Sequence, residues 1–417
     1  MENRPIPERR RNRVPASVPP LGAESHAKTR KDPLPAPSPA PDVVCLTHLR
    51  WDFVFQRPQH LLTRFARDSR VFYVEEPEFD DGISPALSVT LRENGVHVVV
   101  PRLPAGLEAE EVTVLQRELL DELLRRYAIR RYVLWYYTPM ALGFSRHLEP
   151  LSIVYDCMDE LSAFAGAPKA LHEREAELLV RADLVLTGGQ SLYEAKQNMH
   201  PNVHAFPSSV DVKHFASARQ NVEDPADQAS IGGPRLGFFG VIDERMDLEL
   251  VRGVAEARPD WQLVFLGPTC KIDPASFPTL PNVHRLGAKP YKDLPSYVAG
   301  WDVALLPFAR NDSTKFISPT KTPEYLAAGK PVVSTSIRDV VRPYGQQGLA
   351  RIADTIPEFV AAVEAALAEN PAERIARADA FLSRISWERT WFGIRRLLTE
   401  AVEARTTEAA GSDALAG

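Results

Sequence analysis

The sequence predicts an α/β fold in which two parallel-sheet domains of similar size face each other across a cleft. Three observations predict this fold. Short apolar runs alternate with helical patterns along most of the chain, and this alternation is typical of βαβ units. The alternation breaks once, between residues 203 and 233, and then restarts. The chain has 417 residues, which is more than one ordinary hydrophobic core contains, so two domains are expected.

The first domain is predicted over residues 42–215. It begins with the run DVVCLTHLRW (42–51), which is apolar at its start and polar at its end, and is predicted to be a strand. Leu61 and Phe65 follow at helical spacing. Further strands are predicted at 70–77, 96–104, 132–139, 152–160 and 181–189, with helices at about 108–127 and around Tyr193 and Lys196.

Residues 216–233 are polar and contain Gly and Pro, so they are predicted to be the linker between the domains. The second domain is predicted over residues 234–384. Its strands are predicted at 235–242, 261–268, 282–287, 301–308 and 331–335, and its helices at 247–257, 291–299, 357–369 and 371–383, with one more that ends at Gly329. Polar residues, Gly and Pro gather at the carboxyl ends of these strands, the edge where open α/β sheets bind ligands.

Both ends of the chain are predicted to be disordered, at residues 1–41 and 405–417, and a final helix is predicted at 385–404. The first segment is rich in proline and carries an arginine cluster (Arg9, Arg10, Arg11 and Arg13), but it has no apolar run with which to form a core. This cluster is expected either to be solvated or to contact acidic lipid headgroups.

Composition narrows the range of functions that the chain can have. Hydrophobic residues make up 44% of the chain and charged residues 25%, as in soluble globular proteins. The formal net charge of −6 argues against a nucleic-acid partner, because phosphate backbones attract basic surfaces. Cys45, Cys157 and Cys270 are scattered and odd in number, so neither disulfides nor a metal knuckle are expected, which fits a reducing compartment.

Membrane insertion is not expected from the sequence. The chain contains no apolar stretch long enough to span a bilayer, and its N-terminus lacks the apolar segment of a secretory signal. The predicted location is therefore cytoplasmic, and peripheral contact with the inner face of the membrane stays open as an alternative.

The stretch SPTKTPEYLAAGKPVVST (318–335) is the most informative for function. Its acid, Glu324, falls near the start of a predicted helix, where a carboxylate gains roughly 0.3–1 kcal/mol from the helix dipole. A capping role would explain that position. The helix also begins at the carboxyl end of a predicted strand, where free helix amides and a lysine such as Lys321 suit phosphate, and a glutamate suits a pair of sugar hydroxyls.

At this point the sequence resembles a known family. Pro319, Lys321 and Glu324, followed by YLAAGKPVV, are similar to the donor-binding motif of GT-B glycosyltransferases, above all bacterial cell-surface polysaccharide enzymes of the teichuronic-acid and xanthan type. HLRWDFVFQRPQHLLTRFA (48–66) and YDCMDELSAF (155–164) are typical of one branch of these enzymes, and the resemblance covers roughly residues 43–400. It implies two Rossmann-like domains across a cleft, with the C-terminal helix packing back toward the first domain.

The resemblance also implies a donor site in the second domain. Glu324 would hold the ribose of a nucleotide-sugar, while basic side chains and helix amides would hold its diphosphate. The implied donor-binding residues are Gly240, Arg245, Ser318, Thr320, Lys321 and Glu324. The chain departs from the commonest family pattern in two places, because Phe316 stands where many retaining members carry a further glutamate and Val241 stands where an arginine is usual. Arg245 is then either a diphosphate contact or a surface residue at a helix start.

The first domain offers candidates for acceptor chemistry. Asp156 and Asp159 stand three residues apart at the end of the predicted strand 152–160, and an inverting transferase needs one carboxylate as general base. We expect Asp159 to be that base and Asp156 to orient or replace it, although a helix cap and a surface acid would explain both residues equally well.

The loop after the first strand is expected to face the cleft, as it does in the resembled fold. Arg57, Gln56 and His60 stand on this loop and on the helix that follows, where they are expected to contact the acceptor or a phosphate. A surface ion pair for Arg57 and a structural role for His60 are the alternatives.

The sequence therefore predicts a glycosyltransferase that moves a sugar from a nucleotide-sugar to a hydroxyl of a cell-surface polysaccharide or lipid-linked glycan. No cofactor beyond the nucleotide-sugar co-substrate is expected, and no metal, because no Asp-x-Asp pair or His/Cys cluster stands in the predicted donor domain. Two alternatives stay open: a nucleotide-sugar epimerase on the same fold, and a non-catalytic nucleotide-sugar or glycan-binding partner in polysaccharide assembly.

Overall fold

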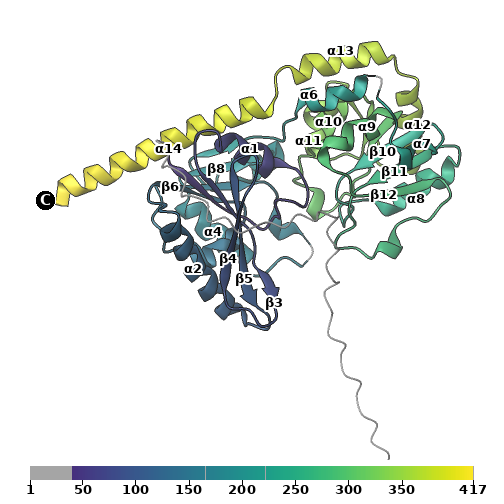
Figure 1. Cartoon of the computed structure of the whole chain (residues 1–417). Coiled ribbons are helices and arrows are strands. Elements are labelled where there is room, and N and C mark those ends of the chain that lie inside the picture. The colour runs from purple at the N-terminus through teal and green to yellow at the C-terminus, as the bar shows by residue number, and fades with distance from the viewer. Residues whose placement is uncertain (1–39, 165, 221, 417) are drawn as a thin grey trace, which may run out of the picture. The chain divides into compact units, whose positions relative to one another are not determined.

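The computed structural model describes residues 40–164, 166–220 and 222–416 (Figure 1). In this part of the chain, the strands form two sheets, and the prediction of an α/β fold is confirmed. The predicted disordered tail at 1–41 lies outside the described residues except for its last two positions. None of the described helices has the length and apolar character needed to cross a bilayer.

The first sheet has nine strands in the order β3-β5-β2-β1-β6-β7-β8-β9, with β4 paired antiparallel to β5. The strands are β1 (Asp42–Leu46), β2 (Val71–Val74), β3 (Glu78–Asp80), β4 (Ala86–Leu91), β5 (Val96–Pro104), β6 (Tyr132–Tyr136), β7 (Ser152–Cys157), β8 (Leu184–Thr187) and β9 (Val203–Ala205). β1 pairs in parallel with both β2 and β6, so the strand order reverses at β1. The short β3, β4 and β9 were not among the predicted strands.

Alternate residues of the strands face opposite sides of this sheet, as the period of an extended chain requires. Val43 and Cys45 belong to one core cluster with helices α1 and α14, while Val44 and Leu46 belong to a second cluster with helices α2 to α5. The helices are α1 (Arg57–Phe65), α2 (Ala109–Arg126), α3 (Leu142–Ser145), α4 (Leu171–Arg181), α5 (Gln190–Lys196) and α14 (Trp387–Ala416). Both faces of the sheet are therefore covered, which explains its near-continuous apolar strands.

The second sheet has six parallel strands in the order β12-β11-β10-β13-β14-β15. They are β10 (Arg235–Phe239), β11 (Gln262–Leu266), β12 (Val283–Gly287), β13 (Val303–Leu306), β14 (Val332–Ser334) and β15 (Ala350–Ile352). The helices of this half are α8 (Leu248–Ala257), α9 (Leu294–Ala299), α10 (Lys321–Ala327), α11 (Arg338–Val340), α12 (Ile356–Leu367) and α13 (Pro371–Leu382). The order reverses at β10, which lies between β11 and β13.

The segment between the two sheets contains short helices. β9 ends at Ala205 and β10 begins at Arg235, on either side of the predicted linker at 216–233. Helix α7 (Ala226–Ala229) forms inside the predicted polar linker, and helix α6 (Val212–Ala216) forms at the end of the predicted first domain, where no helix was expected. Asp211 accepts a hydrogen bond from the His214 amide and so caps α6. The domain boundaries themselves stay predictions.

The C-terminal helix α14 returns to the first sheet, as predicted. Figure 1 shows it in yellow, running from the second half along the first, and it contacts α1, β7 and β8. It continues to Ala416, beyond the predicted end at 404 and through the segment predicted to be disordered at 405–417. The physical reason is composition: this segment contains four Ala and no Pro, so the preceding helix can continue through it.

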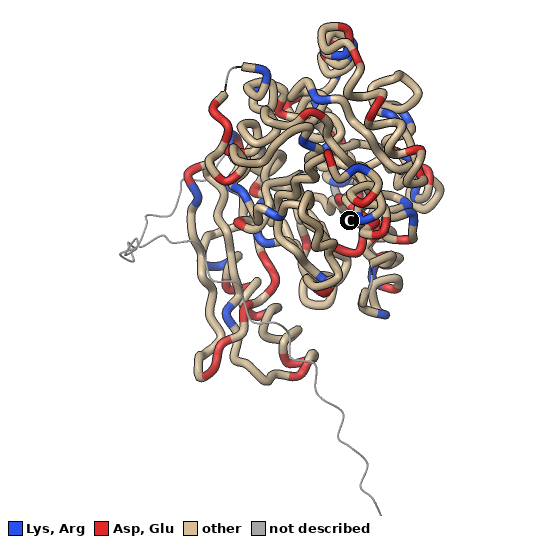
Figure 2. The backbone as a smooth tube through the Cα atoms, turned by 90° about the vertical axis from the view of Figure 1, so that its right-hand side faces the viewer, with Lys and Arg blue, Asp and Glu red and all other residues tan. Residues whose placement is uncertain are grey.

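Charges of both signs are interspersed along the backbone in the view of Figure 2. This pattern agrees with a chain whose formal net charge is only −6 in 417 residues.

Candidate active site

The two sheets direct the carboxyl ends of their parallel strands at one shared cavity of ≈ 420 Å³. The loops after β1 and β10, the strands at which each sheet order reverses, both line it, and ligands bind at such positions in open α/β sheets. Nine predicted site residues line the cavity: Gln56, Arg57, Asp159, Gly240, Arg245, Ser318, Thr320, Lys321 and Glu324. Asp156 and His60 are not among the residues that line it.

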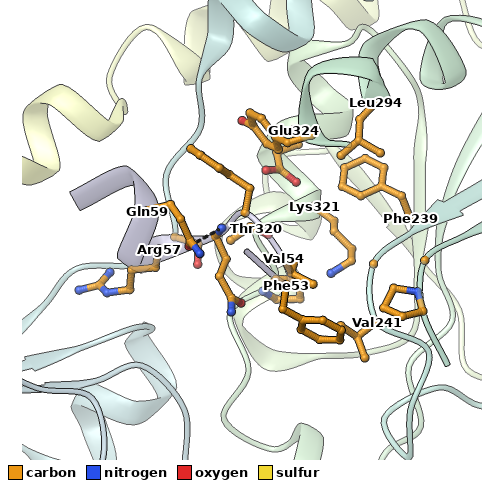
Figure 3. A pocket seen from close by; sticks show the side chains of 18 of the residues that line it. Phe53, Val54, Arg57, Gln59, Phe239, Val241, Leu294, Thr320, Lys321 and Glu324 are labelled. Carbon is orange, nitrogen blue, oxygen red and sulfur yellow. Dashed lines mark hydrogen bonds between the residues drawn. The ribbon is translucent and has the colours of Figure 1, made fainter. Parts of the chain in front are cut away.

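Helix α10 provides the two charged groups at the centre of the cavity. Lys321 is its first residue and Glu324 lies one turn further along, so both side chains extend to the same side (Figure 3). Glu324 is only 5% exposed, and its Oε2 has no hydrogen-bond partner among the described residues. Burial raises the pKa of Glu324 and lowers the pKa of Lys321. A buried carboxylate oxygen without a partner is costly, which favours a ligand contact over the capping alternative.

The Lys321 side chain lies directly over the loop after β10. A Cβ atom at Gly240 would stand 2.2 Å from Lys321 Cε and 2.6 Å from its Nζ, so a side chain at position 240 would displace the lysine. Gly240 also has a φ of +138°, a conformation that favours glycine. Gly240 therefore permits the lysine to reach the cavity.

Arg245 is held toward the cavity by a neighbour two residues away. Its Nε and Nη2 donate to the carboxylate of Asp243 at 3.0 and 2.7 Å, and its guanidinium lies 5.5 Å from the ring centroid of Phe164. Phe164 belongs to the first half, so this contact crosses between the two halves. Asp243 and Phe164 were not predicted as site residues: Asp243 stands outside the quoted motifs, and Phe164 ends the stretch 155–164 without a polar group that would mark it for chemistry.

Asp159 lies on the loop that follows β7 and reaches the cavity from the first half. Burial raises the pKa of its carboxyl, while the nearby Arg245 and Lys321 oppose that rise. The carboxylate is thus in electrostatic contact with the cations of the second half.

The structure places Asp156 in a buried ion pair instead. It is the fifth residue of β7 and is fully buried, and its carboxylate accepts from Nε of Arg57 at 3.0 and 3.1 Å. Arg57 also donates to the Phe206 carbonyl at 2.8 Å. Arg57 thus touches the cavity with part of its side chain while its guanidinium joins α1 to β7, so the surface alternative is wrong for this arginine.

His60 is a buried ring in an aromatic cluster. It stacks on Trp387 of α14 at 4.5 Å between ring centroids, and Phe55 packs edge-on against it. Burial lowers the pKa of His60 to about 3. A neutral ring enclosed in this way supports the structural alternative, and the predicted contact with acceptor or phosphate has no geometric basis in the cavity.

The two halves contact each other beside the cavity. Asp339 of α11 accepts hydrogen bonds from the backbone amides of Gln190 and Ser191 at 2.8 and 3.0 Å, and so caps α5 of the first half. Phe316, the residue at the family's variable glutamate position, packs against the first-half core cluster and does not line the cavity. Sequence reasoning missed Asp339, because the helix that it caps lies in the other half of the chain.

Among the residues that the structure describes, no cluster of three or more His, Cys, Asp or Glu side chains is arranged to hold a metal ion.

Comparisons with known proteins agree with this geometry. A family model described as "Glycosyl transferases group 1" matches residues 233–369. The "Putative teichuronic acid biosynthesis glycosyltransferase TuaH" of Bacillus subtilis (strain 168) is 30% identical over 272 residues, which cover 60% of this chain and 68% of that protein.

Solved structures share the fold at low identity. Sucrose-phosphate synthase from Thermosynechococcus elongatus superposes with a TM-score of 0.67 at 13% identity, over 88% of this chain and 100% of that chain. "Trehalose-6-phosphate from E. coli bound with UDP-2-fluoro glucose" gives 0.64 at 12% identity, over 87% and 99%. The catalytic domain of starch synthase IV from Arabidopsis thaliana, bound to ADP and acarbose, gives 0.60 at 10% identity, over 87% and 99%. These likenesses confirm the predicted GT-B fold.

Proposed function

The chain belongs to the group 1 glycosyltransferases, and from this premise we propose that it transfers a sugar from a nucleotide-sugar to a hydroxyl of a cell-surface polysaccharide or lipid-linked glycan. The name of the Bacillus subtilis relative, which refers to teichuronic acid biosynthesis, supports the class of acceptor. Two proteins of the same fold bound UDP-2-fluoro glucose and ADP, which supports a nucleotide-sugar as donor.

The observation that carries the proposal is the pair of charged groups on α10. The unpartnered, buried Oε2 of Glu324 is suited to accept hydrogen bonds from ribose hydroxyls, and Lys321 is suited to bind phosphate. Because the rise of an α-helix is 1.5 Å per residue, these positions lie about 4.5 Å apart along α10. That spacing fits adjacent ribose and phosphate groups of one nucleotide.

In the proposed reaction, Lys321 and Arg245 stabilise the negative charge that develops on the departing diphosphate. Both cations line the cavity, and Arg245 is oriented by Asp243. We propose that these side chains and the amides at the start of α10 supply the positive charge that other transferases obtain from a metal ion. Closure of the two halves would exclude water, which competes with the acceptor.

Asp159 is the proposed acceptor-side base. It would take the proton from the acceptor hydroxyl as that oxygen attacks the anomeric carbon and the bond to the diphosphate breaks. If the enzyme retains the anomeric configuration, the proton passes to the departing phosphate and Asp159 orients the acceptor. Its place in the cavity beside Arg245 and Lys321 is compatible with either role.

The working location is part of the same proposal. We place the enzyme in the cytoplasm, with peripheral contact at the inner membrane face where a lipid-linked acceptor would be presented. Co-sedimentation of the full-length chain with anionic vesicles, compared with neutral vesicles, tests this contact.

The proposed activity is tested by incubating the enzyme with UDP-, GDP- and ADP-sugars and measuring release of the nucleoside diphosphate. We expect one donor class to be turned over slowly by hydrolysis, and faster when a glycan acceptor is added. The Glu324→Ala variant should lose both the slow hydrolysis and the faster turnover with a glycan acceptor. If none of these nucleotides binds or is released, the proposal is wrong.

A further inference from the structure

The lining of the cavity carries a second buried oxygen without a partner among the described residues. Tyr291 follows β12, lines the cavity, and has a buried Oη that forms no hydrogen bond within the described part of the chain. Glu324 Oε2 is the other buried acidic or phenolic oxygen of this cavity in the same condition. Buried polar atoms without partners are uncommon in folded proteins, so two that line one cavity point to a ligand.

The ring of Tyr291 is held in one orientation by stacking on both faces. Phe55, from the first half, stacks at 4.5 Å between ring centroids and 24° between planes. His214, from α6, stacks at 4.4 Å and 14°, and its Nε2 bonds to the Tyr291 carbonyl at 3.0 Å. A ring enclosed in this way cannot turn its hydroxyl toward another partner, so the position of Oη is fixed before a ligand arrives.

The chemistry of the two oxygens is complementary. Burial raises the pKa of Tyr291, and the nearby carboxylate of Glu324 raises it further, so the phenol stays protonated and able to donate. When it is ionised, the carboxylate of Glu324 can only accept. A ligand hydroxyl can accept from the first group and donate to the second, whereas a phosphate oxygen can only accept.

The rest of the lining offers surfaces for the other parts of a nucleotide. Five apolar residues that line the cavity are suited to a base: Phe239, Leu266, Ala288, Pro290 and Leu294. Lys321 and Arg245, which are suited to phosphate, line the same cavity. The sugar of a nucleotide joins its base to its phosphates, and the oxygens of Tyr291 and Glu324 are suited to the hydroxyls of that sugar.

We propose that Tyr291 donates a hydrogen bond to a ribose hydroxyl that Glu324 also contacts, and so makes the donor site selective for ribonucleotides over their deoxy forms. This inference rests on the proposed function, because it requires a nucleotide in the cavity. The stacked rings of Phe55 and His214 act as positioning groups for the hydroxyl.

The test compares the binding of ribose and deoxyribose ligands by isothermal titration. UDP, ADP and GDP are titrated first, and the 2′-deoxy and 3′-deoxy forms of the tightest of the three follow. In Tyr291→Phe, which keeps the stacked ring, we expect affinity for the ribonucleotide to fall about three- to tenfold. Affinity for the deoxy form that lacks the recognised hydroxyl should not change.

A matched control is available in the same segment. Tyr297 is buried, but its hydroxyl donates to Asp227 at 2.8 Å and it does not line the cavity. Tyr297→Phe should bind the ribonucleotide and both deoxy forms as the wild type does. The inference is overturned if Tyr291→Phe weakens binding of the ribonucleotide and of both deoxy forms equally, or if it weakens binding of none of them. If the wild type binds none of the three nucleotides, the proposed function fails first and the inference fails with it.

Discussion

Burial without a partner sets Glu324 apart from the other carboxylates discussed above. Asp156, Asp243 and Asp339 are each satisfied by an arginine or by backbone amides, and such carboxylates stabilise the fold. Glu324 stabilises nothing with its Oε2, and burial raises its pKa. At the residue scale, a buried polar group without a hydrogen-bond partner therefore marks the candidate site of this chain.

The first prediction concerns Glu324. Replacing it with alanine removes the acceptor for ribose hydroxyls, so the dissociation constant for the nucleoside diphosphate should rise about tenfold, or about 1.4 kcal/mol. The melting temperature should not fall, since an unpartnered buried carboxylate is removed. Titration calorimetry on the purified variant measures the change, and unaltered affinity would return Glu324 to a capping role.

The second prediction concerns the phosphate cations. Lys321→Ala and Arg245→Ala should weaken binding of the nucleoside diphosphate more than binding of the nucleoside, because each charge acts on phosphate. Arg258 offers a matched control, since it forms its ion pair with Asp260 away from the cavity. Arg258→Ala should leave the affinities for both ligands unchanged. Equal losses for nucleoside and diphosphate in Lys321→Ala would contradict the placement of the phosphates.

The third prediction separates Asp159 from Asp156. Asp159→Asn should lower turnover roughly a hundredfold, the usual scale of general-base catalysis, with nucleotide affinity kept within about threefold. Asp156→Asn leaves the buried Arg57 with a neutral partner, so it should lower the stability of the fold, by up to about 3–5 kcal/mol. Steady-state kinetics and urea unfolding distinguish the two effects. Full activity in Asp159→Asn would show that the proton leaves by another route.

At the scale of elements, helix α1 links the cavity to the rest of the first half. Its Arg57 joins β7, and its His60 stacks on Trp387 of α14. Helical spacing at Leu61 and Phe65 predicted this helix, but the partners of its polar residues could not be predicted. Arg57 and Asp156 lie 99 positions apart in the chain, and only the sheet order brings them together.

The fourth prediction is a pH dependence that follows from His60. Its pKa is lowered by burial from 6.5 to about 3, so between these values the unfolded state binds the proton that the folded state excludes. The stability contributed by the neutral ring is fully present above pH 6.5 and is lost as the pH falls, by about 1.4 kcal/mol per pH unit. Urea unfolding at pH 7 and pH 5 measures this loss. His60→Phe, which keeps a stacked ring, should lose less stability between pH 7 and pH 5 than the wild type. If the variant loses as much stability as the wild type, other groups cause the pH dependence.

At the scale of the whole molecule, the sequence predicted the two sheets and the shared edge, because apolar periodicity and polar strand ends are local signals. All six predicted donor residues line the cavity for the same reason: they follow strands or stand in the first turn of a helix. Tyr291, Phe164 and Asp339 could not be predicted. Each acts across the two halves through a contact that no local pattern records.

The fifth prediction tests how the chain joins its halves. Trp391 of α14 is 4% exposed and belongs to the core cluster on one face of the first sheet. Trp391→Ala should therefore lower the stability of the first half by about 3–5 kcal/mol, although the residue is far along the chain. Hydrogen exchange should detect the loss in β1 and β7. The exposed Phe392 offers the control, since Phe392→Ala should cost far less. Loss confined to the second half would contradict the packing of α14.

The return of α14 also has a consequence for how the protein is made. Domains generally fold as the ribosome releases them, from the N-terminus onward. Here one face of the first sheet lacks Trp387, Trp391 and Ile394 until the last helix has been translated. The half that is synthesised first is therefore the half that is completed last, and a late premature stop codon would leave its apolar face uncovered.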